Sequence, residues 1–405
     1  MKKYDIIIIG GGASGLAAAA AAKRTASDLR VAIIERLPKV GKKILATGNG
    51  RCNLSNSEIS VNKYHGSCNK LLDMTNGFSV PLFFESLGLL CGDDGYGRIY
   101  PRCRSAASVL DALRLENARL GIDEICGFDV KNIKETKGYD IISGNDIING
   151  RKLILSGGGK SQSALGSNGS LLDICMNMGI KAVPFYPALV PLKTDPALVK
   201  PLKGLRAEAA VSFRAKERTI AGSCGEVQFT DGLLSGICVF DLSYLYEHYK
   251  DSSEIILDLM PDMSLEELSE LLKNIRSIRI QTSSEDYLSG IFTRPLGNYI
   301  IKRSVSENIG YTRDITDRMI SRIARKIKSL SFPVIGTAGF ERSQVTGGGI
   351  PADEINDTFE LKRKTGIYVC GEMLDIFGDC GGYNLDFAFS SGYSAGRNAA
   401  LSAIL

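Results

Sequence analysis

Glycines near the N-terminus are the first residues whose spacing could do chemistry. Gly10, Gly12 and Gly15 form a G-x-G-x-x-G pattern. Such a turn lets the backbone approach a pyrophosphate closely, and the helix that follows offers unpaired N–H groups to the phosphates. Glu35 lies twenty residues beyond Gly15, where it could accept hydrogen bonds from ribose hydroxyls. The pattern predicts a dinucleotide site but does not distinguish FAD from NAD.

A second candidate is the segment 41–53, which reads GKKILATGNGRCN. Its small and turn-forming residues would let the backbone wrap around a flat ligand. Lys42, Lys43 and Arg51 could offset phosphate charge or stabilise a reduced, anionic flavin. A solvated loop explains the same residues equally well. Cys52 lies inside the segment, and a spectator thiol is the more common role because reactivity needs a lowered pKa.

A third candidate lies near the C-terminus. Gly371 and Glu372 follow an apolar run, and Gly381 and Gly382 precede a helix-forming segment. This arrangement would offer backbone N–H groups to a flavin carbonyl edge or ribityl chain, although a plain helix cap is the alternative. The segment 156–159 is also glycine-rich, but no acidic residue ends a strand about twenty positions later. It is better interpreted as the point where the chain returns to the first fold.

Alternating strands and helices are needed to position these segments. Residues 4–9 and 31–34 are β-branched runs typical of strands buried on both faces, and the alanine-rich segment 13–26 between them predicts a helix. This is a βαβ unit of a parallel sheet. Residues 38–57 are expected to form a long loop, and 383–401 a closing helix.

The middle of the chain has a different character. From 186 to 260 short β-rich runs alternate with glycine turns, which predicts a small barrel or sandwich. Residues 264–328 switch to helix, with a capping box at Ser264 and Glu267. Ile315, Met319, Ile323 and Ile327 recur every four residues and would form one apolar face.

Composition limits the classes of protein. The chain has 405 residues, a formal charge of +4, ten cysteines and two histidines. The charge is too small to argue for nucleic acid, and no C-x-x-C pair is present to relay electrons. We therefore expect reduced thiols in a cytoplasmic protein without a metal site. No segment approaches the roughly 18 apolar residues of a membrane span, so we expect no membrane anchor.

One basic run could be taken for a nucleic-acid surface. It comprises Arg318, Arg322, Arg325, Lys326 and Lys328, on one helix opposite its apolar face. Such a run is usually a solvated helix face. Nucleic acid is therefore not the expected partner, and a small-molecule substrate is.

The motifs together resemble those of a known bacterial flavoprotein family, the BaiN/YhiN-like group, also called the aminoacetone oxidase family of FAD-binding enzymes. The resemblance covers essentially the whole chain. The matching segments are GGGASG (10–15), GKKILATGNGRCNLSN (41–56), PALVPL (187–192), GEVQFTDGLLSG (225–236), VTGGGI (345–350) and GEMLDIFGDCGGYNL (371–385).

The resemblance implies an α/β fold, with an FAD-binding Rossmann-like domain of the glutathione-reductase type. The FAD domain would comprise residues 1–185 and 347–405. A β-barrel insert would comprise 186–262 and 329–346, interrupted by a helical subdomain at 263–328. These boundaries agree with the changes in composition near 185, 264 and 330.

The resemblance also implies which residues surround a non-covalent FAD. Segments 41–53 and 381–385 would wrap the flavin. The predicted contacts are Gly10, Gly12, Ala13, Ser14, Gly15, Glu35, Arg36, Lys42, Lys43, Thr47, Gly48, Asn49, Gly50, Arg51, Cys52, Asn53, Gly157, Gly158, Gly371, Glu372, Gly381, Gly382, Tyr383, Asn384 and Leu385. Tyr383 and Arg51 are the candidate catalytic residues.

The implied activity is that of an FAD-dependent oxidoreductase. Reduction of an unsaturated carbonyl compound, such as a steroid or bile-acid-like enone, is favoured, with NAD(P)H as a donor that binds transiently. The alternatives are an oxygen-using amine oxidase and a non-catalytic flavin-holding protein associated with RNA or sensing. Two departures from the family pattern, Ser161-Gln162-Ser163 and Ile237 after LSG, leave the substrate open.

Overall fold

The computed structural model describes residues 2–250 and 252–405. The chain divides into two compact units, Met1–Pro187 with Ser343–Leu405, and Ala188–Arg342. Each unit has its own hydrophobic core. The first unit is therefore built from both ends of the chain, and the second is a continuous insertion. The finer three-part division expected from the sequence stays a prediction.

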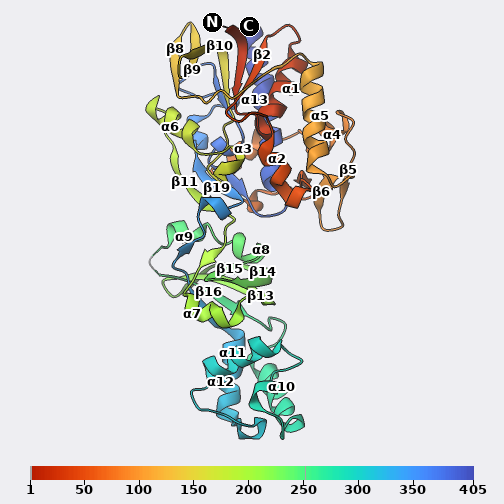
Figure 1. Ribbon diagram of the computed structural model, residues 1–405, viewed down its shortest axis with the longest axis vertical. Helices are drawn as coiled ribbons and strands as arrows, with labels where there is room; N and C mark the ends of the chain where they lie inside the picture. The colour runs from red at the N-terminus through yellow and green to blue at the C-terminus, as the bar shows by residue number, and fades with distance from the viewer. Residues whose placement is uncertain (1, 251) are drawn as a thin grey trace. The chain divides into compact units, whose positions relative to one another are not determined.

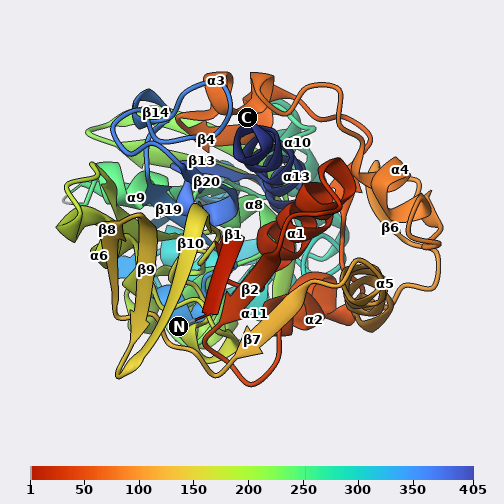
Figure 2. The ribbon, with the colours of Figure 1, turned by 90° about the horizontal axis from the view of Figure 1, so that it is seen from above.

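A seven-stranded sheet forms the centre of the first unit (Figure 2). Six strands pair in the order β7 (Asp123–Cys126), β2 (Val31–Glu35), β1 (Lys2–Ile9), β10 (Asp146–Leu155), β9 (Gly138–Ser143) and β8 (Asn132–Thr136). The seventh, β20 (Ile367–Val369), also pairs with β10. The pairs that involve β1, β2, β7, β10 and β20 with one another are parallel. This is the parallel sheet that the βαβ pattern predicted.

Two helices from opposite ends of the chain pack together on one face of this sheet. They are α1 (Ala13–Thr25) and α13 (Tyr383–Ile404), which lie side by side in Figure 2. A Cβ at Gly392 or Gly396 of α13 would collide with backbone atoms of Ser14 or Ala18 in α1. Glycine at these positions lets the two backbones approach closely. The packing brings the C-terminal motif next to the N-terminal glycine turn.

The expected long loop at 38–57 is partly structured. It contains the short helix α2 (Lys42–Ala46), a 3₁₀ turn (Thr47–Gly50) and strand β3 (Ser55–Asn56). Four of the five residues of α2 are good helix formers, and Ile44 is buried. The many glycines and asparagines of this segment predicted a loop, because a helix of five residues is too short to be recognised among them.

The first unit's remaining helices and strands surround this framework. They are β4 (Tyr64–Gly66), α3 (Cys68–Asp73), α4 (Val80–Glu85), β5 (Cys91–Asp93), β6 (Arg98–Pro101), α5 (Ala106–Arg119), α6 (Ser170–Asn177), β11 (Val183–Ala188), β19 (Val345–Gly349) and β21 (Ile376–Gly378).

The second unit contains an antiparallel sheet (Figure 1). Its strands follow the order β17 (Leu330–Pro333), β16 (Ser253–Asp258), β13 (Arg206–Ala215), β14 (Arg218–Thr230), β15 (Leu233–Ser235), β12 (Leu192–Lys193) and β18 (Gly336–Thr337). Alternate residues of β13 are buried, as expected for a strand with one face on a core. With β17 and β18 as edge strands, closure into a barrel stays a prediction.

Helices lie between β16 and β17 in the sequence. The main ones are α10 (Leu265–Ile278), α11 (Arg294–Ser304) and α12 (Asp317–Lys328). The capping box at Ser264 and Glu267 is present, which confirms that prediction. On the predicted apolar face, Ile315, Ile323 and Ile327 are buried and Met319 is partly buried. Among the described residues, no helix has both the length and the apolar character needed to cross a membrane.

Candidate cofactor-binding site

The turn after β1 accepts only glycine at two of its positions. Gly10 has a φ of +110°, and a Cβ there would collide with the carbonyl of Ser156. A Cβ at Gly15 would collide with the carbonyl of Gly10. The Ser156 hydroxyl lies 3.0 and 2.9 Å from the carbonyl oxygens of Ile9 and Gly10. The end of β10 therefore holds the turn against the sheet.

Helix α1 begins at this turn with its N–H groups unopposed. Gly12 is the cap residue, and the first turn of the helix contains no acidic residue. The first N–H groups of any helix lack partners within it, and they carry a partial positive charge. A Cβ built on Gly12 meets no atom within 4 Å, because this side of the turn faces open space. A pyrophosphate could occupy that space.

Glu35 is fixed by two backbone hydrogen bonds. Its carboxylate accepts from the N–H groups of Gly11, at 2.9 Å, and Leu37, at 2.8 Å. A carboxylate has about four acceptor positions. Two therefore stay available, and the side chain lines a cavity at the end of β2. This geometry is suitable for binding ribose hydroxyls.

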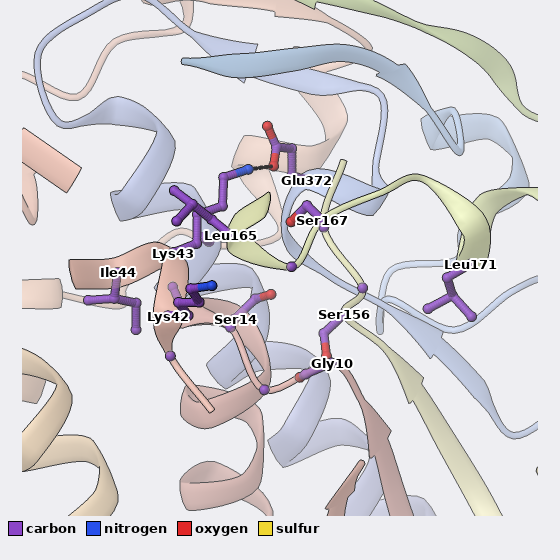
Figure 3. A pocket seen from close by; sticks show the side chains of 18 of the residues that line it. Gly10, Ser14, Lys42, Lys43, Ile44, Ser156, Leu165, Ser167, Leu171 and Glu372 are labelled. Carbon is purple, nitrogen blue, oxygen red and sulfur yellow. Dashed lines mark hydrogen bonds and ion pairs between the residues drawn. The ribbon is translucent and has the colours of Figure 1, made fainter. Parts of the chain in front are cut away.

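The cavity beside this turn has a volume of about 1430 Å³, its open mouth included. All its lining residues belong to the first unit. It extends along segments from both chain ends, several of which are labelled in Figure 3. The predicted contacts that line it are Gly10, Gly12, Ala13, Ser14, Glu35, Arg36, Lys42, Lys43, Thr47, Gly157, Gly158, Glu372, Asn384 and Leu385.

An ion pair between Lys43 and Glu372 crosses the cavity wall (Figure 3). The Lys43 ammonium donates to the Glu372 carboxylate at 2.9 Å. The same carboxylate accepts from the N–H groups of Gly159, at 3.2 Å, and Thr346, at 2.7 Å. Glu372 thus joins α2, the glycine run after β10 and β19. The ammonium is held at the cavity, where it could face an anionic ligand group.

Two other basic residues predicted to contact the cofactor, Arg36 and Lys42, bind backbone carbonyls of the protein. Arg36 donates to the carbonyl of Gly166 at 2.8 Å, and Lys42 donates to the carbonyl of Ala164 at 2.9 Å. Both acceptors belong to the loop before α6. Leu165 of this loop lines the cavity together with Ser167. The two side chains therefore secure a covering segment that the sequence did not predict.

All of segment 48–53 lies outside the described cavity lining. Gly48, Asn49, Gly50 and Arg51 are exposed, and Asn49 has a φ of 54°. Cys52 is buried, and burial raises the pKa of its thiol to about 11. The thiol is protonated at neutral pH, which makes it a poor nucleophile. Flavin contacts by these residues and by Asn53 stay predictions.

The C-terminal motif is split in the same way. Asn384 and Leu385 line the cavity, whereas the described lining does not include Gly15, Gly371, Gly381, Gly382 or Tyr383. Asn384 accepts from the N–H of Gly378 at 2.8 Å and donates to its carbonyl at 2.7 Å, so its amide closes the loop before α13. Cofactor contacts by the residues outside the lining, and catalysis by Tyr383 and Arg51, stay predictions.

Tyr64 is a lining residue that sequence reasoning missed. Its hydroxyl donates to the Tyr383 carbonyl at 3.0 Å, and the two rings meet edge to face with centroids 5.7 Å apart. Burial raises the pKa of Tyr64 far above its usual value, so the hydroxyl stays protonated. Tyr64 lies on β4, which pairs with β21. No local pattern could have indicated that this distant strand reaches the cavity.

Other missed residues line both ends of the cavity. They are Phe128, Asp129 and Val130 after β7, Gln344 and Val345 at β19, and Ile376, Phe377, Phe387 and Ala388 near α13. The N–H of Phe128 donates to the Glu35 carbonyl at 3.0 Å, which places this segment beside β2. One signal for this segment was available, because it follows a strand of the same parallel sheet that comes after the strand ending at the acidic Glu35.

These residues fit a bound FAD. Open space at Gly12, free helix N–H groups and the Glu35 carboxylate meet the needs of a pyrophosphate and a ribose. Lining segments from both ends of the chain extend the cavity beyond a single βαβ unit. The fold and site define a dinucleotide-binding α/β protein whose cavity fits FAD.

A comparison with known protein families gives a match over nearly the whole chain. The family model described as the HI0933-like protein Rossmann domain matches residues 4–398. The chain belongs to this family, which confirms the resemblance seen in its motifs.

Known proteins with similar sequences or folds agree with this assignment. The 3-dehydro-bile acid delta(4,6)-reductase of Clostridium scindens is 36% identical over 389 residues, which covers 93% of this chain and 94% of the relative. A ribosomal RNA dihydrouridine synthase of Haemophilus influenzae is 27% identical, over 90% of this chain and 91% of the relative. A flavocytochrome c3 fumarate reductase has a similar fold, with a TM-score of 0.52 and 14% identity over 100% of this chain and 79% of that one.

Proposed function

We propose that this FAD-dependent oxidoreductase reduces a carbon–carbon double bond conjugated to a carbonyl. The 36% identity to a bile-acid reductase over nearly both full lengths is the observation that carries the proposal. The second relative's name, dihydrouridine synthase, implies the same chemistry on a uracil ring. In the proposed reduction of an enone, the β-carbon gains a hydride and the α-carbon gains a proton.

Bound FAD supplies the hydride chemistry. The chain's own residues would bind and orient it: the α1 N–H groups and Glu35 would hold its polar parts, and Glu372 keeps the Lys43 ammonium at the cavity. The apolar lining at Ile376 and Phe377 excludes water. Tyr64 keeps its proton, which it donates to the Tyr383 carbonyl, so Tyr64 holds the start of α13 in place while Tyr383 and Arg51 stay the candidate catalytic residues.

The preferred substrate is a steroid or bile-acid-like enone, or a similar small molecule. We propose NAD(P)H as the donor. Among the described residues, only the glycine turn at Gly10 joins a strand to a helix and is followed by a strand that ends in an acidic residue. The glycines after β10 belong to the same sheet and do not begin a second dinucleotide-binding fold. NAD(P)H would therefore bind transiently and leave after reducing the flavin.

Anaerobic stopped-flow mixing tests this function. The flavin absorbance of the purified holoenzyme should bleach with NADH or NADPH and return on addition of a 3-oxo-4-ene steroid. If neither nucleotide bleaches the flavin while a small amine does, and the amine-reduced enzyme consumes oxygen once air is admitted, the protein is an amine oxidase and the proposal is wrong.

Uracil in RNA is a second candidate substrate. The alignment covers 91% of the dihydrouridine synthase, so the similarity is not confined to a cofactor-binding segment. The sequence alone suggested a non-catalytic protein associated with RNA as an alternative. The name of this relative instead supports a reductase that acts on RNA. Mass spectrometry of an RNA transcript incubated with the reduced holoenzyme should show two added hydrogens at a uridine. A transcript of unchanged mass would exclude it.

A further inference from the structure

The β5–β6 hairpin of the first unit carries a concentration of arginines. Arg98 lies on β6, and Arg102 and Arg104 follow within six residues. Arg51, in the loop after α2, is exposed like Arg102 and Arg104. In Figure 1, β5 and β6 lie below α5 and α4 at one side of this unit.

Contacts through Tyr100 bring the hairpin and the loop together. The Arg104 guanidinium carbon lies 4.4 Å from the centroid of the Tyr100 ring. A Cβ at Gly48 would lie 3.6 Å from Cε1 of the same ring. Arg51 closes a turn on Gly48, because its N–H donates to the Gly48 carbonyl at 3.1 Å. Tyr100 therefore joins the segment that carries Arg104 to the loop that carries Arg51, and the first residue of this loop, Thr47, lines the cofactor cavity.

Three of these guanidinium groups have no carboxylate partner. Arg98 pairs with Asp94 at 2.8 Å. Within residues 2–250 and 252–405, Arg51, Arg102 and Arg104 form no ion pair. An exposed guanidinium keeps its planar set of donors, which matches a phosphate group and binds it through two hydrogen bonds. These arginines are therefore free to bind an external polyanion.

An exposed aromatic ring completes this surface. Tyr96, at the tip of the hairpin, is 82% exposed. Its ring is held by the Arg98 guanidinium, 5.6 Å from the ring centroid, and its N–H donates to the Asp94 carboxylate at 3.0 Å. A fixed, exposed ring is a platform on which a base can stack. Tyr96 lies at the tip of the hairpin, and Arg102 and Arg104 follow the other end of β6, so one extended strand of several nucleotides would contact both. An aromatic platform and free arginines along one strand favour single-stranded nucleic acid over an acidic peptide, which offers no bases.

We propose that this hairpin surface, defined by Arg51, Tyr96, Arg102 and Arg104, binds a single-stranded segment of RNA beside the cofactor cavity. The inference rests on the second candidate function, reduction of uracil in RNA. It differs from the basic face of α12, where Lys328 is committed to Asp258 at 2.7 Å.

Fluorescence anisotropy with a labelled oligouridylate tests the proposal on the full-length holoenzyme. We expect binding that weakens with salt, with a logarithmic slope of roughly −2 for about three phosphate contacts at ~0.7 each. Arg102→Gln with Arg104→Gln should weaken binding roughly tenfold or more and make the slope shallower by about 1.4. Tyr96→Ala should weaken binding about tenfold without changing the slope, because it removes stacking rather than charge.

The matched control is Arg318→Gln with Arg325→Gln, which removes the same charge from the exposed face of α12. It should bind as wild type. The proposal is overturned if wild type does not bind, if the α12 control loses affinity while the hairpin variant does not, or if oligoglutamate of equal charge competes as well as RNA. Enone reduction and flavin content, measured on the same samples, report separately on the proposed function. Melting curves confirm that each variant folds.

Discussion

Single glycines at the N-terminal turn have different roles, although they belong to one motif. Gly10 and Gly15 are required because side chains there would collide with protein backbone. Gly12 is different, since a Cβ there would project into open space. The motif predicted the turn itself from the sequence, because a tight turn between a strand and a helix depends mainly on neighbouring residues, and the ligand contact at Gly12 stays a prediction. A substitution at Gly12 should therefore affect the ligand and not the fold.

Gly12→Val should weaken FAD binding by roughly 100-fold, about 3 kcal/mol, by displacing charge-assisted hydrogen bonds to the pyrophosphate. The melting temperature of the FAD-free protein should barely change. Flavin fluorescence titration of the apoprotein measures the affinity. Gly310→Val is the matched control, since it too adds side-chain atoms where nothing lies within 4 Å. Equal flavin affinity in both variants would contradict the proposed cofactor position.

Asp386, in the first turn of α13, is a partly buried carboxylate whose ionisation opposes folding. Burial raises its pKa from 3.8 to about 6, although a hydrogen bond from the Ser55 hydroxyl acts in the other direction. Between about pH 4 and pH 6 the folded protein keeps a proton that the unfolded chain has lost. Stability from this group is therefore complete below pH 4 and is lost as the pH rises to 6.

Asp386→Asn should remove this pH dependence, because an amide does not ionise and its oxygen can still accept from Ser55. Above pH 6 the variant should be more stable than wild type by roughly 1–3 kcal/mol, the upper value being the full cost of about two pKa units. Melting curves at pH 4 and pH 8 test it. The same difference between variant and wild type at both values would rule out the carboxylate as the cause.

The residue of the cavity lining that sequence reasoning missed depends on tertiary contacts. Arg51 and Tyr383 were chosen because they lie inside distinctive motifs, yet Tyr64 is the tyrosine on the cavity lining. Tyr64 reaches it through β4, whose partner β21 is more than 300 residues away in sequence. Proximity of that kind leaves no local pattern of spacing or periodicity.

At the level of elements, long periodic segments were predictable and short irregular ones were not. The strands and helices around β1, α1 and β2 were recognised because burial on both faces and alanine density are strong signals. Helix α2 was interpreted as loop because its five residues are too few to show a period. The loop before α6 was missed, since its cover over the cavity depends on Arg36 and Lys42 from distant elements.

Glu372 links three elements, and its charge is essential to that role. Glu372→Gln replaces one acceptor oxygen with an NH₂ group and leaves the Lys43 ammonium without its partner. We expect a loss of roughly 2 kcal/mol in stability and about tenfold weaker FAD binding, because hydrogen bonds to charged groups are worth about 1.5–3 kcal/mol each. Chemical unfolding and flavin titration measure both. Glu58→Gln, at an exposed carboxylate, is the control and should have no effect.

For the whole molecule, the composition changes near residue 185, and the chain divides into compact units after Pro187. The two units have separate cores, one rich in parallel-strand isoleucines and the other built from alternating strand positions and helix faces. Sequence patterns identify such a change but do not fix which strands pair across it. All residues that line the cofactor cavity belong to the first unit. Cofactor binding should therefore stabilise the two cores unequally.

Hydrogen exchange of the apoprotein and holoprotein tests this directly. FAD at 100 times its dissociation constant should stabilise the first unit by about 2.7 kcal/mol, because it binds only the folded form. Amides in β1, β2 and α1 that exchange by global opening of that unit should slow by up to ~100-fold. Amides in β13 and β16 should keep their rates, since they open with the second core. If β13 and β16 slow as much as β1, the two cores unfold together as one cooperative structure.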